Sequence, residues 1–212
     1  MAKTEKFEED LIFMLSKLGQ GMQEERRDKL NRLKDRLMQL HKANMVKINH
    51  SVMELVCAKY LILKDYDAIV EHPLDGGLTC DLYATKGYGS LIVEIETGFI
   101  PPDHALDPTT YLLARIAGKI VRYSNYADKF ALGIPPYYIL QIPEAFSISP
   151  RQRKTEDLER IESLCALYYQ NPPLSLEEVK NARLHVIYII DVDDATIEEI
   201  SPETYVTKTS NL

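Results

Sequence analysis

The sequence predicts an α/β fold, in which a mixed β-sheet is flanked by helices and preceded by an N-terminal helical hairpin. Three observations support this prediction. Two amphipathic helical patterns fill the start of the chain. Three short strand patterns with glycine-rich connections follow them, and a strand, a long helix and a second apolar strand then occur in succession. The last arrangement is typical of a crossover between parallel strands.

The first two helical patterns cover residues 5–18 and 22–43. Their apolar residues recur at helical spacing, and Gly19 and Gly21 separate the two segments. The second segment repeats leucine in a 3-4-3 pattern over about two heptads. We expect a helical hairpin that packs on the core or on a second subunit.

Charge is unevenly distributed along the chain. The net charge is −7, whereas residues 24–47 hold eight lysines and arginines and four acidic residues. A local basic surface on an acidic body is compatible with nucleic-acid contact. The alternative is that these charges form a solvated helix face.

A third helix is expected at residues 47–64. Between Val52 and Leu63 its only charged residues are Glu54 and Lys59, so most of its surface should be buried. Glu54 shares one helical stripe with His50, four residues earlier. A buried carboxylate requires a partner or a metal ion, because burying it alone is costly. Pairing with Lys59 is the local alternative.

Three strands are expected at residues 66–72, 78–85 and 90–97. The turns between them, Leu74–Gly77 and Lys86–Gly89, are short and rich in glycine. Short connections of this kind join antiparallel neighbours, so the three strands should form a meander.

A long helix with clear start signals follows a proline-rich loop. Asp107 occupies the N-cap position and Pro108 the first helical position, and we expect the helix to end near Leu132 and Gly133. The remaining expected elements are a buried strand at 137–142, an amphipathic helix at 154–170, an apolar strand at 184–192 and a peripheral tail. The expected division is an N-terminal helical region at 1–46, a core at 47–192 and a C-terminal tail at 193–212.

The third strand carries the most informative side chains. Glu94 and Glu96 alternate with apolar residues, so both carboxylates point to the same face. Two like charges on an apolar strand need positive partners or a cation. Asp81 lies on the adjacent strand, where a tight turn can place it beside Glu94. Carboxylates of this kind are ligands for Mg²⁺ or Mn²⁺.

The long helix offers cations near this face. Arg115, Lys119 and Arg122 fall within a narrow arc of the helical wheel. Such groups can contact a phosphate or stabilise the charge that develops during phosphodiester hydrolysis. Gly118 lies beside them and permits close approach of the backbone. The alternative is a solvated, charged helix face.

Together these segments resemble the PD-(D/E)XK nuclease superfamily. Its pattern is an acidic residue on a helix, an Asp on one strand and Glu-x-Lys on the next; here these positions are similar to Glu54, Asp81 and Glu94-Ile95-Glu96. The resemblance covers about residues 47–142 and implies a restriction-endonuclease-like core. The length and segments are also similar to nuclease-like proteins of Sulfolobus spindle-shaped viruses, and the nearest functional analogy is with archaeal Holliday-junction resolvases, which are dimers.

The resemblance implies a Mg²⁺- or Mn²⁺-dependent DNA endonuclease that acts on duplex or branched DNA as a homodimer. Asp81, Glu94 and Glu54 would bind the metal, and Glu96 and Lys119 would complete the catalytic set. Arg115, Lys119 and Arg122 would contact DNA. One position departs from the pattern, because Glu96 stands where the family has lysine. Either Lys119 supplies the ammonium, or Glu96 is an extra ligand, or catalysis has been lost.

Two other functions stay open at this point. The first is a non-catalytic nucleic-acid-binding or assembly module on a degenerate nuclease fold, which the missing lysine and the acidic net charge favour. The second is a structural dimer whose acids form ion pairs. The sequence lacks a glycine-rich phosphate loop, a Ser/His/Asp arrangement and a dinucleotide fingerprint, so no organic cofactor is expected. With no apolar run of about 18 residues and three separated cysteines, we expect an intracellular protein without membrane contact, in the host cytoplasm if it is viral.

Overall fold

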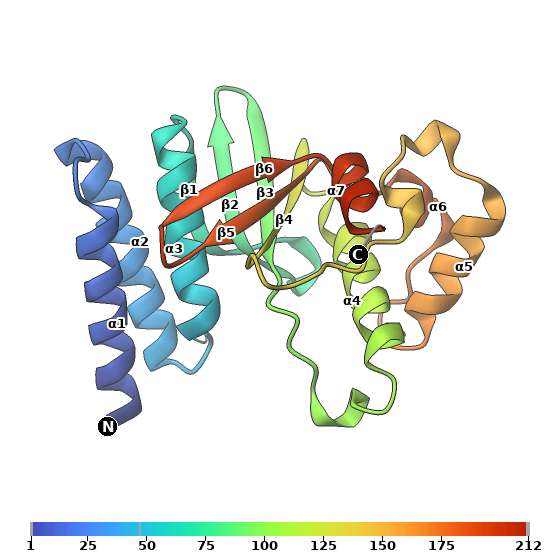
Figure 1. The fold of residues 1–212 in the computed structure, drawn as a ribbon, viewed down its shortest axis with the longest axis horizontal. Helices are drawn as coiled ribbons and strands as arrows, with labels where there is room; N and C mark the ends of the chain where they lie inside the picture. Colours follow the sequence, from blue (N-terminus) through green and yellow to red (C-terminus); the bar gives the residue numbers. More distant parts are fainter. Residues whose placement is uncertain (1, 47, 211–212) are drawn as a thin grey trace.

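A six-stranded mixed sheet lies at the centre of the fold, with helices on both faces (Figure 1). The computed structural model of the chain describes residues 2–46 and 48–210. The strands follow the order of the chain across the sheet, and their bounds are β1 Asp67–Pro73, β2 Thr79–Lys86, β3 Gly89–Ile95, β4 Lys129–Ile134, β5 Val186–Asp191 and β6 Thr196–Ile200. The first three form the expected antiparallel meander, β4 and β5 run parallel to β3, and β6 is antiparallel to β5.

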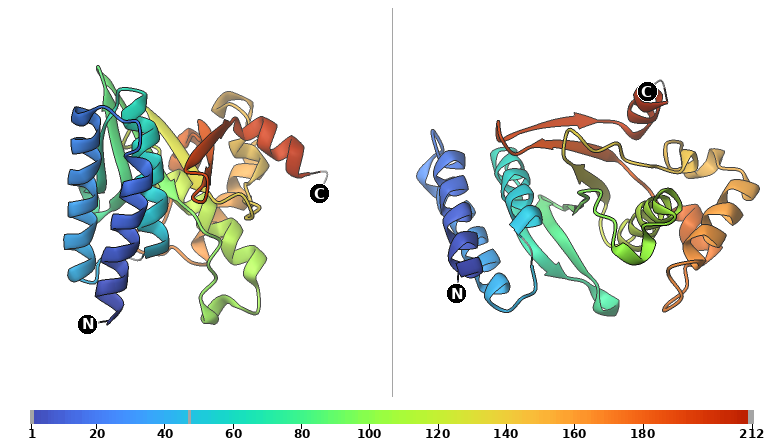
Figure 2. Two further views of the ribbon diagram at one scale, coloured as in Figure 1. Left: turned by 60° about the vertical axis from the view of Figure 1, so that its left-hand side comes forward. Right: turned by 60° about the horizontal axis from the view of Figure 1, so that its bottom comes forward.

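Alternation along the strands creates two hydrophobic cores, one on each face of the sheet. On β3, Leu91, Val93 and Ile95 belong to one core, while Ile92 belongs to the other. The first core is covered by α1 Ala2–Leu18, α2 Glu24–Lys42 and α3 Ile48–Leu63, and the second by α4 Pro108–Tyr123, α5 Thr155–Ala166, α6 Leu176–Asn181 and α7 Pro202–Thr209. Figure 2 shows the two groups of helices on opposite sides of the strands. Cys57, Cys80 and Cys165 are free and buried in these cores.

The N-terminal helices lie side by side against the first core, and ion pairs also link α2 to the edge of the sheet. The Phe7 ring of α1 stacks on His41 at the end of α2, with 3.6 Å between ring centroids. Near the start of α2, Arg26 pairs with Asp65 at 2.7 Å and Lys29 with Asp67 at 2.6 Å. Part of the basic stretch therefore holds α2 against β1, which corresponds to neither of the two interpretations made from the sequence. Lys47, where α3 was expected to begin, lies outside the described residues.

The expected long helix was wrong in its second half. Helix α4 ends at Tyr123, and residues 129–134 form β4, while the strand expected at 137–142 is absent there. The apolar run from Phe130 to Ile134 is buried on both faces of the sheet, so its hydrophobic pattern does not distinguish a buried strand from a helix. Asp128 fixes the start of this strand, because its carboxylate accepts hydrogen bonds from the backbone N–H and the hydroxyl of Ser90.

The C-terminal residues are part of the sheet, which corrects the expectation of a peripheral tail. Strand β6 pairs with β5, and the Tyr205 side chain of α7 is buried in the second core. Its hydroxyl accepts a hydrogen bond of 2.8 Å from the Leu140 N–H. Strand β6 is short and mostly polar, as edge strands often are, so it carried little hydrophobic signal. Helix α6 was also missed, although its Ser175–Glu178 capping box was visible in the sequence.

None of the helices in the described part of the chain has the length and apolar character needed to cross a membrane.

Candidate functional site

Two carboxylates lie where strands β2 and β3 separate. Regular pairing between these strands stops at Leu82 and Val93. Beyond that point side chains replace backbone partners: the Asp81 N–H donates to Glu94 Oε1 at 3.0 Å, and the Ile95 N–H donates to Asp81 Oδ2 at 2.5 Å. The structure therefore places Asp81 beside Glu94 and fixes both carboxylates by the strand backbones.

Helix α3 adds Glu54 and His50 to the same place. Ligand atoms of His50, Glu54 and Asp81 all lie within 4.8 Å of one another. The two helix residues are four positions apart, so both project from one face of α3 toward the sheet. Glu54 is fully buried, and neither of its carboxylate oxygens has a hydrogen-bond partner among the described residues. A buried, unpartnered carboxylate beside a second carboxylate and an imidazole is a donor set that a divalent cation fits.

Negative charge accumulates around Glu54. Burial raises the pKa of Glu54 well above its ordinary value, and the charges of Asp81, Glu71 and Glu94 raise it further. Burial and Asp81 likewise raise the pKa of Glu94 to about 8, although Lys119 opposes the shift, and that of Glu71 to about 7. A bound cation would offset this repulsion and let the carboxylates ionise.

Lys119 of α4 places an ammonium group among these acids. Its Nζ donates to the Ile95 carbonyl at 3.0 Å and lies 2.7 Å from Glu96 Oε1 and 3.1 Å from Glu94 Oε2. It is 4.0 Å from Asp81 Oδ2. Burial alone would lower its pKa, but the surrounding carboxylates raise it above the ordinary value, so the ammonium stays protonated.

Glu96 is the partner of two helix cations. Besides Lys119, the Arg115 Nε lies 3.0 Å from Glu96 Oε1. Burial would raise the pKa of Glu96, but Lys119 and Arg115 outweigh it and hold the pKa below its usual value. The geometry matches the alternative in which Glu96 pairs with cations rather than binding the metal.

Arg122 lies away from these residues. Its guanidinium is 4.5 Å from the centre of the Tyr169 ring and donates to the Pro172 carbonyl at 3.2 Å. Arg122 is three residues after Lys119 on α4, and its side chain contacts the segment after α5 instead of β2 and β3. The structure thus brings Arg115 and Lys119 to the acids and leaves Arg122 in a separate contact.

An open cavity of about 600 Å³ leads to the site. Its lining includes His50, Glu71, Asp81 and Arg115. Glu71 has a left-handed backbone conformation (φ 47°), which is unusual for a glutamate. Arg36 of α2 holds this segment by donating to the Val70 and Glu71 carbonyls, both at 2.8 Å. Strain of this kind, maintained by a dedicated contact, is often found at functional sites.

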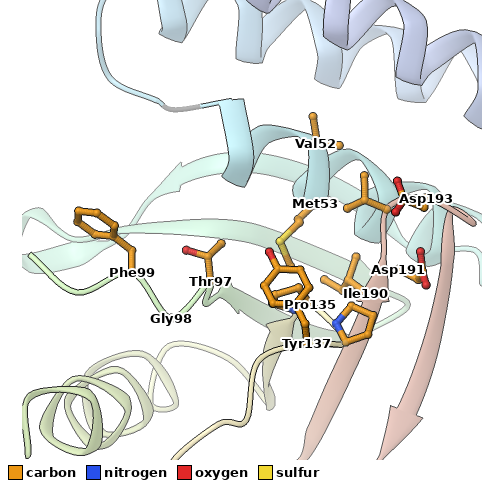
Figure 3. A pocket seen from close by; sticks show the side chains of 12 residues that line it. Val52, Met53, Thr97, Gly98, Phe99, Pro135, Tyr137, Ile190, Asp191 and Asp193 are labelled. Atoms are coloured by element: carbon orange, nitrogen blue, oxygen red, sulfur yellow. The ribbon is translucent and has the colours of Figure 1, made fainter. Parts of the chain in front are cut away.

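A second cavity of about 760 Å³ adjoins the first and shares Thr97 and Phe99 with it. Figure 3 shows its lining, which comes from α3, from the segments after β3 and β4, and from the end of β5. Phe99 and Tyr137 are both exposed on it. The acids therefore lie at one end of a longer open surface along the carboxyl ends of β3, β4 and β5.

Sequence reasoning placed His50 on the stripe of Glu54 without selecting it as a site residue, and it offered Glu71 only as a weak alternative acid. The spacing of four residues between His50 and Glu54 was visible, but the histidine lacked a sequence neighbour of its own type. Comparison of the chain with protein-family models, curated proteins and solved structures gives no match.

Proposed function

We propose that this chain is a metal-dependent endonuclease of the PD-(D/E)XK type that hydrolyses phosphodiester bonds of DNA. The observation that carries the proposal is the buried, unpartnered carboxylate of Glu54, placed with Asp81 and His50 beside the Lys119 ammonium. The order α3, β1, β2, β3, α4, β4 supports it, since the family resemblance implies the same succession of elements.

The donor set fits Mg²⁺ or Mn²⁺, with Asp81 and Glu54 as carboxylate ligands and His50 as a nitrogen ligand. Glu94 accepts the Asp81 N–H and faces Lys119, so it completes the acidic shell from the other side. An imidazole ligand favours Mn²⁺ over Mg²⁺, because Mg²⁺ prefers oxygen. When bound, the ion would lower the pKa of water and polarise the phosphoryl oxygen.

The protein's own residues supply position and charge. Lys119 presents an ammonium next to the acids, where it can bind a non-bridging phosphate oxygen and stabilise the charge that develops during hydrolysis. Glu96 pairs with both Lys119 and Arg115 and so holds Lys119 in place. In this proposal Lys119, on the helix that follows β3, takes the role of the motif lysine. Glu96 occupies the motif position itself and holds Lys119 in place.

The proposed substrate is duplex or branched DNA, and the proposed assembly is a homodimer. Two copies of the site related by a two-fold axis would suit a symmetric DNA substrate. Ile12 and Phe13 are adjacent on α1 and are 53% and 70% exposed, which supports a contact between copies through the N-terminal helices.

A non-catalytic nucleic-acid-binding module is the second candidate, and one observation favours it. Lys119 pairs with Glu94 and Glu96, and Arg115 pairs with Glu96, so in this candidate neither cation is free to act in catalysis. A protein of this second kind would bind DNA without cleaving it.

Cleavage of labelled linear, single-stranded and four-way-junction DNA in Mg²⁺ or Mn²⁺ separates the two candidates. We expect the wild type to cut at least one substrate and Lys119→Ala to lose the activity. Arg122→Ala is the matched control, because this arginine is on the same helix but away from the acids. DNA binding without cleavage by the wild type would favour the second candidate and overturn the first.

A further inference from the structure

A second charged cavity, remote from the acids, lies where β5 begins. Its volume is about 630 Å³, and it is formed by the segment at 146–153, by residues 183–185 and by the start of α7. This cavity shares no lining residue with the cavity at Asp81. Figure 1 shows α7 beside the yellow segment that precedes α5, which brings these parts of the chain together.

Positive side chains dominate this cavity. Arg151, Arg153, Arg183 and His185 line it, whereas Glu203 is its single acidic lining residue in the described part of the chain. Among residues 2–46 and 48–210, no carboxylate pairs with any of the three arginines. Three arginines without a carboxylate partner therefore line one cavity of a protein whose net charge is −7.

Arg153 is held rigidly in the cavity wall. Its Nη1 donates to the carbonyls of Val179 and Lys180, at 3.1 and 3.0 Å, and its guanidinium lies 5.0 Å from the centre of the Phe146 ring. Its Nε is buried and has no hydrogen-bond partner among the described residues. Burial and the nearby charge of Arg183 lower the pKa of Arg153 to about 10. The two arginines therefore repel each other, and an anion between them would relieve the repulsion.

His185 adds a neutral donor to the same lining. Its Nδ1 lies 3.0 Å from the Phe130 N–H and accepts that hydrogen bond, so the neutral ring carries its proton on Nε2. Burial and the charge of Arg183 lower the pKa of His185, which favours the neutral form. A neutral imidazole N–H and several guanidinium groups form a set of hydrogen-bond donors.

We propose that this cavity binds phosphate groups. Guanidinium groups match phosphate oxygens with paired N–H donors, which makes arginine the preferred residue for phosphate recognition. The same chemistry is presented by a nucleic-acid backbone and by free phosphate or pyrophosphate. The proposal does not depend on the endonuclease activity, because the two cavities share no residue.

Isothermal titration calorimetry with the full chain tests the proposal. The probes are inorganic phosphate, pyrophosphate and a short single-stranded oligonucleotide, each titrated in EDTA so that no divalent metal acts at Asp81. We expect Arg183→Ala and Arg151→Ala each to weaken binding by about tenfold. For the oligonucleotide, each variant should also make the affinity less dependent on salt concentration, by the amount that corresponds to the loss of about one phosphate contact. Both arginines are exposed, so these variants should keep the fold, which circular dichroism checks.

Arg160→Ala is the matched control, because this exposed arginine lies on α5 outside the cavity. If the oligonucleotide binds most tightly, the ligand is a nucleic-acid backbone. If pyrophosphate binds equally tightly, the ligand is a free phosphate compound. Either result supports the site. Two results would overturn it: no binding of any probe by the wild type, or the same loss of affinity in Arg160→Ala as in the two cavity variants.

Discussion

Replacing Glu54 by glutamine removes the charge of the buried carboxylate while keeping nearly the same side-chain volume. Because neither oxygen of Glu54 has a hydrogen-bond partner in the described residues, the substitution breaks no hydrogen bond there. It also removes the cost of burying a charge and the repulsion from Asp81, Glu71 and Glu94, which together raise the pKa of this group. We therefore expect Glu54→Gln to stabilise the metal-free protein while abolishing metal binding, as is common for residues kept for function.

The difference in stability between Glu54→Gln and the wild type depends on pH in a defined direction. Since the pKa of Glu54 is raised in the folded protein, the folded state binds more protons than the unfolded state above the ordinary pKa of 4.5. The free energy of unfolding of the wild type then falls relative to the variant as the pH rises, by up to about 1.4 kcal/mol per pH unit. The difference between the two proteins should nearly vanish at acidic pH and grow until the folded-state carboxyl ionises.

Metal should reverse the order of stability. At about 100 times its dissociation constant, Mn²⁺ would stabilise the wild type by about 3 kcal/mol. For a chain of this size the gain corresponds to a rise in Tm of about 5–10 °C. Glu54→Gln should show little or no such rise, because one of the proposed ligands is lost.

Urea denaturation followed by circular dichroism, across a pH series with EDTA or with Mn²⁺, measures both effects. Glu159→Gln, an exposed position on α5, controls for the removal of one negative charge. The reasoning is refuted if Glu54→Gln is less stable than the wild type in EDTA at neutral pH, or if Mn²⁺ stabilises both proteins equally.

Three further substitutions test separate parts of the account. Lys119→Met should lower the free energy of unfolding in EDTA by about 3–5 kcal/mol, because buried carboxylates lose their ammonium partner; Lys119→Arg should recover part of the loss. Gly118→Ala should cost about 1–3 kcal/mol, since its Cβ would lie 2.6 Å from the Tyr169 ring. Tyr205→Phe should cost about 1 kcal/mol by removing the acceptor of the Leu140 N–H. Urea denaturation measures all three, and a stable Lys119→Met or unchanged values for the other two would contradict these contacts.

Local patterns were enough to predict the elements that position the site. Glycine-rich turns identified the β1–β3 meander, and the N-cap at Asp107 identified the start of α4. The boundary between α4 and β4 could not be read, because a fully buried parallel strand and a buried helix share the same apolar composition. What separates them is tertiary: Gly133 fits between the Ile95 and Ile190 side chains, where a Cβ would approach within 2.8 Å of each.

The part of the site on β2 and β3 was predictable, because side chains alternate along a strand and a tight turn makes the two strands neighbours. The tight turn and strand alternation could place Asp81 beside Glu94, whereas the helical arc offered Lys119, Arg115 and Arg122 without distinguishing among them. The joining of His50 to Glu54 and Asp81 depends on how α3 crosses the sheet, which no local pattern records. The strained backbone at Glu71 depends on Arg36, a residue of α2 far from it in the sequence. The separate location of Arg122 likewise depends on a tertiary contact, because the segment at Tyr169 and Pro172 packs against that part of α4.

The most direct test of the central claim is the Mn²⁺ dependence of DNA cleavage by the wild type and by Asp81→Asn, measured on the same four-way-junction and duplex substrates. Asp81→Asn keeps the size of the side chain and an oxygen that can accept the Ile95 N–H, so the fold should persist. We predict metal-dependent cleavage by the wild type, none in EDTA, and a loss of activity in Asp81→Asn. Cleavage that survives in Asp81→Asn, or that proceeds without a divalent metal, would contradict the account.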